Sequence, residues 1–214
     1  MKAVIPESAE LMVAKFNHED TMAACGYSDG FVRVFNLGTD NKIAEINAGA
    51  KEPGPVNALC WRPFNETNSS SAAVILVGNT NGHLYQYAAK TGKEIFHTIE
   101  EGNYIMAMDY VPSGHTFCTA GKDNTIRIYD EETKKVVRQL SAVKWHKQGH
   151  NNRVFSVKFK KDEPDILVSG GWDQNVTNEI FRSIFGIYVH KAWFLQFMDL
   201  KLLETQLTLD RTSY

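Results

Sequence analysis

The chain has few of the residues that small extracellular domains and metal sites require. Three of its 214 residues are cysteines and six are prolines. Cys25, Cys60 and Cys118 lie far apart inside apolar segments, so we expect buried, reduced thiols and neither a disulfide framework nor a metal site. The motifs CxxC, HExxH and GxxxxGK do not occur. The sequence therefore predicts no metal, no cofactor and no phosphate-binding loop.

The sequence also lacks a large excess of positive or negative charge, and it has few long apolar runs. The 23 Lys and Arg nearly balance the 25 Asp and Glu, whereas a protein that neutralises many phosphates needs a clustered basic surplus. Residues 1–13 lack the uninterrupted apolar core of a secretory signal. Residues 184–200, the most apolar stretch, contain His190, Lys191 and Asp199, which disfavour a membrane span. We expect an intracellular protein that contacts no membrane, cytoplasmic in the first place, with the cytoskeleton, the cilium or the nucleus as alternatives.

What the sequence does contain is an internal repeat. Four segments alternate apolar and other residues with a period of two, which is typical of half-buried strands; they are residues 11–16, 56–61, 105–110 and 154–159. Each segment ends in an aromatic residue, and these aromatics are Phe16, Trp61, Tyr110 and Phe159. They recur at intervals of 45, 49 and 49 residues, so four similar units follow one another along the chain.

A second strand and a tight turn follow each of these segments. The turns contain Gly together with Asp or Asn, which supply positive φ and local capping of the backbone. The turn residues are Asp29, Asn81, Asp123 and Asp173. A polar insertion of about seven residues after Arg62 explains the longer spacing in the second unit and belongs on a surface loop. Third strands at 31–36, 83–88 and 125–130 and a fourth strand after a short link complete a pattern typical of propeller blades.

The units resemble WD40 repeats of the β-propeller family. The resemblance lies in AACGYSDGFVRVFN, FCTAGKDNTIRIYD and the segment 149–176, which opens with a Gly149-His150 pair. In that family each blade is held by a His before the first strand, a Ser or Thr in the second, an Asp in the turn and a Trp in the third. The resemblance implies a structural network in every blade, here formed by Asp29, Asn81, Thr119, Asp123, Tyr129, His150, Ser169 and Asp173.

The third unit offers no His in the segment before its first strand, and no unit has the complete set. Because GxSxG is absent and a blade network accounts for His150, Ser169 and Asp173, we expect no catalytic residues and no enzyme. Replacing Asp123 or Asp173 by Ala is expected to lower stability. A propeller that hydrolyses a substrate or binds a small molecule is the alternative.

The fourth unit departs from the pattern. Thr177 follows Asp173 by four residues, whereas Thr133 follows Asp123 by ten. The alignment therefore predicts that the core of the third strand is missing between Val176 and Thr177. Either other segments fill the strand position or the unit is frayed or rearranged.

The predicted fold is all-β, with about three complete WD40-type blades and one partial blade in an incomplete propeller. The repeat region covers 1–185, with units near 9–48, 54–100, 103–142 and 150–185. Residues 186–214 form a tail in which apolar side chains at three- and four-residue spacing indicate a helix. This helix would cover the open end of the blades or dock on another chain; an alternative splice product would also explain the change.

The resemblance implies a non-catalytic scaffold that binds other proteins in a larger complex, including a partner that completes the propeller. The candidate surface lies in the connections before the first strands and in the tail; its residues are Trp145, His146, Lys147, Arg153, Trp193 and Phe197. An aromatic residue beside basic ones is a common interface composition, although Trp145 as a packing cap on its own blade fits equally well. The basic loop 144–153 leaves an RNA-associated module as a further alternative.

Overall fold

A computed structural model describes residues 9–39, 41–48, 54–64, 73–141, 149–163 and 165–173, together with the backbone of residues 176–180. All regular structure in these residues is β-strand. The strands are β1 Leu11–Phe16, β2 Met22–Tyr27, β3 Phe31–Asn36, β4 Asn41–Asn47, β5 Val56–Trp61, β6 Val74–Asn79, β7 His83–Ala88, β8 Lys93–Ile99, β9 Ile105–Tyr110, β10 Thr116–Gly121, β11 Ile126–Asp130, β12 Val136–Leu140, β13 Val154–Phe159, β14 Ile166–Gly171 and β15 Val176–Ile180. The predicted helix in the tail lies outside the described residues.

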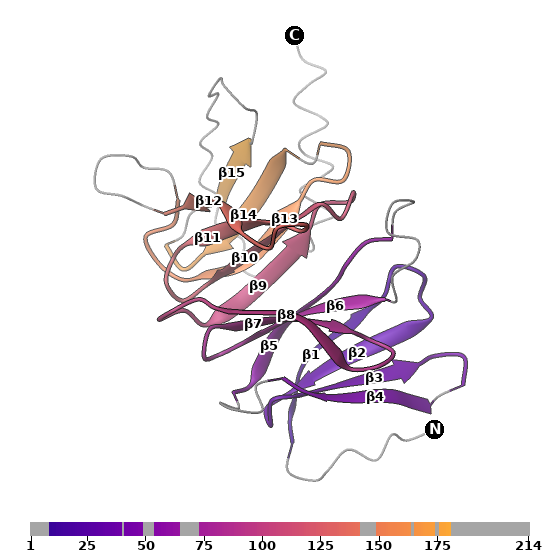
Figure 1. Cartoon of the computed structure of the whole chain (residues 1–214). Helices are drawn as coiled ribbons and strands as arrows, with labels where there is room; N and C mark the ends of the chain where they lie inside the picture. Colours follow the sequence, from indigo (N-terminus) through magenta and orange to yellow (C-terminus); the bar gives the residue numbers. More distant parts are fainter. Residues whose placement is uncertain are drawn as a thin grey trace.

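The strands form four antiparallel sheets in chain order, which we call blades 1 to 4 (Figure 1). Blades 1, 2 and 3 are the four-stranded sheets β1–β4, β5–β8 and β9–β12, and blade 4 is the three-stranded sheet β13–β15. The first strands contact one another from blade to blade, β1 with β5, β5 with β9 and β9 with β13. The first strands therefore line one side of the blade array, as the inner strands of a propeller do. The predicted all-β blade architecture is confirmed.

Blade 4 corrects one detail of the sequence alignment. The strand β15 pairs with β14, with Gly170 opposite Val176 and Ile166 opposite Ile180. It begins three residues after Asp173, just as β11 begins three residues after Asp123. The residues assigned to the link after the missing strand thus occupy the third-strand position themselves. In the described residues, the strand that blade 4 lacks is the fourth.

The blades pack face to face through three apolar clusters. One cluster joins Val32 and Val34 of blade 1 to Trp61 of blade 2, and the other two lie between blades 2 and 3 and between blades 3 and 4. In the second cluster, the rings of Phe117 and Tyr129 stack at 4.9 Å between centroids. Since each strand alternates its side chains between two faces, every internal blade contributes to two clusters.

A register shift occurs at the same place in all four blades, near the start of the first strand. It lies between Leu11 and Val13 in blade 1, between Val56 and Ala58 in blade 2 and between Val154 and Ser156 in blade 4. In blade 3 the shift lies opposite Ala120 and Gly121. A bulge of this kind bends a strand and increases its twist. Alternation alone did not predict it, because an extra residue interrupts the period of two only locally.

Candidate functional site

A buried carboxylate organises blade 3. Glu100, 3% exposed, lies between the last strand of blade 2 and the first strand of blade 3. Its Oε1 accepts hydrogen bonds from Thr119 Oγ1 at 2.5 Å and Tyr129 OH at 2.8 Å. Its Oε2 accepts from Asn103 Nδ2 at 2.7 Å and Arg127 Nη1 at 3.2 Å. Burial, reinforced by Glu100, raises the pKa of Tyr129, so the phenol stays protonated and donates to the carboxylate.

Glu100 takes the position that the WD40 pattern gives to histidine. It precedes Thr119 by 19 residues, and His150 precedes Ser169 by the same 19 residues. Glu100, Asn103 and Arg127 were not among the residues predicted for this network, although the 19-residue spacing to Thr119 distinguishes Glu100 in the sequence. A carboxylate accepts several hydrogen bonds at once, which explains why the residues around it are donors.

Blade 4 holds the corresponding network around a histidine. His150, 1% exposed, has Nδ1 at 2.8 Å from Asp173 Oδ1 and Nε2 at 2.9 Å from Ser169 Oγ. The other oxygen of Asp173 accepts from the backbone N–H of Asn151 at 3.0 Å. The three predicted residues are thus brought together inside one blade. They join the second strand and the turn to the connection before the first strand.

In blades 1 and 2 the residues around the turn make different contacts from those in blades 3 and 4. In blade 1, Asp29 accepts from the backbone N–H of Phe31 at 3.0 Å and pairs with Arg33 at 3.0 Å. In blade 2 the capping side chain is Asn79, whose Oδ1 accepts from the backbone N–H of Asn81 at 3.0 Å. The position of Thr119, four residues before the turn residue, is occupied by Cys25 in blade 1 and by Val77 in blade 2.

A second buried carboxylate joins blades 2 and 3. Glu131, 7% exposed, follows β11 and reaches two side chains of blade 2. Arg62 Nη1 lies 3.0 Å from Glu131 Oε1, and Gln86 Nε2 lies 2.8 Å from Oε2. Within blade 3, Tyr110 OH donates to Oε2 at 3.0 Å and Lys134 Nζ lies 2.7 Å from Oε1. Burial and the neighbouring Glu131 raise the pKa of Tyr110, so its hydroxyl remains a donor.

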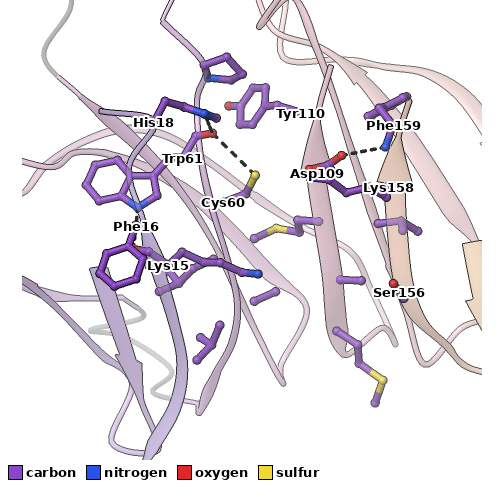
Figure 2. A pocket seen from close by; sticks show the side chains of 18 of the residues that line it. Lys15, Phe16, His18, Cys60, Trp61, Asp109, Tyr110, Ser156, Lys158 and Phe159 are labelled. Carbon is purple, nitrogen blue, oxygen red and sulfur yellow. Dashed lines mark hydrogen bonds and ion pairs between the residues drawn. The ribbon is translucent and has the colours of Figure 1, made fainter. Parts of the chain in front are cut away.

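The first strands of all four blades enclose a groove with a volume of about 670 Å³, which we call the first-strand groove (Figure 2). Its wall includes Lys15 and Phe16 on β1, Trp61 on β5, Asp109 on β9 and Lys158 on β13. The indole N–H of Trp61 donates to the carbonyl of Lys15 at 2.9 Å and ties β5 to β1. The groove is therefore a surface that several blades build together.

Lys158 and Asp109 form an ion pair in the wall of the groove. Lys158 Nζ lies 2.5 Å from Asp109 Oδ1, and the backbone N–H of Phe159 donates to Asp109 Oδ2 at 2.8 Å. Burial would lower the pKa of Lys158, but Asp109 outweighs it and the pKa is raised. The lysine therefore stays charged at the groove. Burial of the thiol raises the pKa of Cys60 from its ordinary 9.0 to about 12, which makes it a poor nucleophile.

The described part of the chain contains no group of three or more His, Cys, Asp or Glu side chains arranged to hold a metal ion. Across the same residues, no helix has the length and apolar character needed to span a bilayer.

Among the residues predicted to bind a partner, only Arg153 is described. Its guanidinium lies 5.6 Å from the ring centroid of Trp172, and the side chain of Trp172 is exposed. Trp145, His146, Lys147, Trp193 and Phe197 lie outside the described residues. Trp172 also meets Phe155 edge to face, with 5.2 Å between centroids; it therefore belongs to a surface aromatic cluster and not to the third strand.

Sequence and structure comparisons agree with this arrangement of blades. A family model described as "Anaphase-promoting complex subunit 4 WD40 domain" matches residues 71–162. The WD repeat-containing protein 91 homolog of Dictyostelium discoideum is 27% identical over 162 residues, which cover 76% of this chain and 20% of the relative. Subunit I of human eukaryotic translation initiation factor 3 is 28% identical over 106 residues, 48% of this chain and 30% of the relative.

A chain in the crystal structure of the mitotic checkpoint complex superimposes with a TM-score of 0.68 at 17% identity, covering 84% of this chain and 50% of that one. This likeness concerns the fold. The present chain spans less than a third of the length of either relative.

The blade order and the networks around Glu100 and His150 define a set of β-propeller blades. The family-model match over residues 71–162 and the related WD-repeat proteins show that the chain is similar to WD40-repeat proteins.

Proposed function

We propose that this protein is a non-catalytic scaffold that holds a protein assembly together, and that one face of blade 1 accepts a blade-shaped partner surface. The observation behind the proposal is a difference in exposure at equivalent positions. Leu11 opens the first strand of blade 1 as Val56, Ile105 and Val154 open those of blades 2, 3 and 4. These three equivalents are 0% exposed, whereas Leu11 is 52% exposed.

The aromatic residue that ends each first strand repeats the contrast. Trp61, Tyr110 and Phe159 are 4%, 5% and 3% exposed, but Phe16 is 65% exposed. Each buried aromatic belongs to the apolar cluster that its blade shares with the preceding blade. The open face of blade 1 therefore has the residues of an inter-blade contact, and contiguous apolar exposure of this kind marks an interaction site.

The polar clusters support a structural role. Glu100, Glu131 and His150 each bind partners on at least two strands or connections, so their hydrogen-bonding capacity is directed into the fold. A catalytic acid or base instead has to reach a substrate. The related subunit I of a translation initiation factor and the WD40 domain of an anaphase-promoting complex subunit are named as parts of complexes, which supports an assembly role.

The test replaces Leu11 by Asp and compares proteins captured by the variant and the original chain with quantitative mass spectrometry. Because Leu11 lies on the open face, we expect specific partners to be lost while the thermal midpoint stays within a few degrees. Val137→Asp is the matched control, since Val137 is 62% exposed on the outer strand β12. If Leu11→Asp retains every partner, or Val137→Asp loses the same ones, the proposed face is wrong.

The stability of the isolated chain provides a second readout. Trp61→Ala removes a buried aromatic and should cost about 3–5 kcal/mol, whereas Phe16→Ala should cost less than about 0.5 kcal/mol in the free protein. A comparable loss for Phe16→Ala would mean that Phe16 is already covered within this chain.

A further inference from the structure

The first-strand groove has an excess of positive charge. Lys15 on β1 and Lys158 on β13 reach it from opposite walls (Figure 2), and Lys161 lies two residues after the end of β13. All three lysines are exposed. The acid that lines the groove is Asp109, 5% exposed and occupied by Lys158 and by the amide of Phe159. A concave surface lined by one sign of charge focuses its field on a ligand of the opposite sign.

Exposed aromatic side chains accompany the lysines. Phe16, Phe64 and Phe155 all line the groove, and they are 65%, 63% and 41% exposed. Aromatic surface beside cationic side chains suits a ligand that combines carboxylates with apolar groups. Trp61, which also lines the groove, is only 4% exposed, so the three phenylalanines supply the aromatic surface that a ligand can reach.

The backbone favours a polypeptide as the ligand. Within the described residues, β1, β5, β9 and β13 are terminal strands of their sheets. A terminal strand has one edge whose N–H and C=O groups are not used by its own sheet, and an extended peptide can pair with such an edge. Nucleic acid fits less well, because the described residues that line the groove include no arginine and the chain as a whole has a net charge of -2.

We propose that the first-strand groove binds an acidic protein segment that contains at least one bulky apolar side chain. The carboxylates contact Lys15, Lys158 and Lys161, and the apolar side chain packs among Phe16, Phe64 and the neighbouring strands. The proposal rests on the scaffold function and deepens it by naming the chemistry of a second ligand, whose binding surface shares Phe16 with the open face of blade 1. Leu11 does not line the groove, so the Leu11→Asp test and the groove test fail independently.

The experiment measures the fluorescence anisotropy of a labelled synthetic peptide of twelve residues, with eight acidic residues and two phenylalanines. The groove variant is Lys15→Glu with Lys161→Glu, which leaves the Lys158–Asp109 pair intact. The control variant is Lys93→Glu with Lys135→Glu, because these two lysines are exposed away from the groove and the change in net charge is the same. Both variants are first checked for an unchanged thermal midpoint.

We expect the groove variant to bind the acidic peptide at least about tenfold more weakly, which corresponds to about 1.4 kcal/mol, and the control variant to lose less than about twofold. Binding should also weaken with salt, since the screening length falls from about 10 Å at 0.1 M to about 3 Å at 1 M. Equal losses in both variants, equal binding of a lysine-rich peptide, or no binding of the acidic peptide would overturn the proposal. Tighter binding of a single-stranded RNA of the same length would replace it by a nucleic-acid site.

Discussion

Removing the carboxylate of Glu100 should destabilise the protein more than any change at an exposed acid. In Glu100→Ala, buried Thr119, Asn103 and Tyr129 lose their acceptor, and Arg127 loses one of its carboxylate partners. An orphaned buried donor costs about 1–3 kcal/mol, and breaking a buried charged pair costs about 3–5 kcal/mol. The contributions are not additive, because water can enter the cavity and Arg127 keeps Asp123 as a partner. We therefore expect a loss of about 3–5 kcal/mol.

Urea unfolding followed by tryptophan fluorescence measures this loss directly, because Trp61 lies in a core between blades. A domain of ordinary stability, about 5–15 kcal/mol, would lose at least about a fifth of its free energy of unfolding. Glu100→Gln keeps the shape without the charge and should lose about 1–2 kcal/mol. Glu101→Ala is the control, since Glu101 is adjacent and exposed. Equal midpoints for Glu100→Ala and Glu101→Ala would refute the role of Glu100 in the network.

Three other perturbations have defined outcomes. Gly121→Ala should destabilise by about 2 kcal/mol or more, because a Cβ there would overlap the carbonyl oxygen of Tyr104, whereas Gly170→Ala meets no atom within 4 Å and should be neutral in thermal unfolding. Asp173→Ala, which removes the partner of His150, should lower the midpoint in calorimetry by an amount equivalent to about 1–3 kcal/mol; an unchanged midpoint would contradict the network in blade 4. Since the pKa of Cys60 is raised from 9.0 to about 12 by burial, its contribution to stability is complete below about pH 9 and is lost as the pH rises toward 12. Cys60→Ala should therefore make the alkaline decrease in the free energy of unfolding shallower, and an identical slope would argue against a buried thiol.

The residues of the candidate site could be predicted from the sequence where they followed the family pattern. His150, Ser169 and Asp173 were named because their types and spacing matched a WD40 repeat, and the structure places them within hydrogen-bonding distance. Glu100 was not named, because a carboxylate performs the task that the pattern assigns to an imidazole. The first-strand groove was not foreseen either, since its lining residues come from four strands that are distant in sequence.

The sequence by itself determined the repeating strands, the turns and the order of the blades. Those features depend on alternation within a few residues and on the backbone preferences of Gly, Asp and Asn, which act locally. The tertiary structure alone decided that Val176–Ile180 serves as the third strand of blade 4. It also decided that Phe16 is exposed while its equivalents Trp61, Tyr110 and Phe159 are buried. Both outcomes depend on which neighbour each strand or face meets, and the same local pattern is compatible with a covered or an open face.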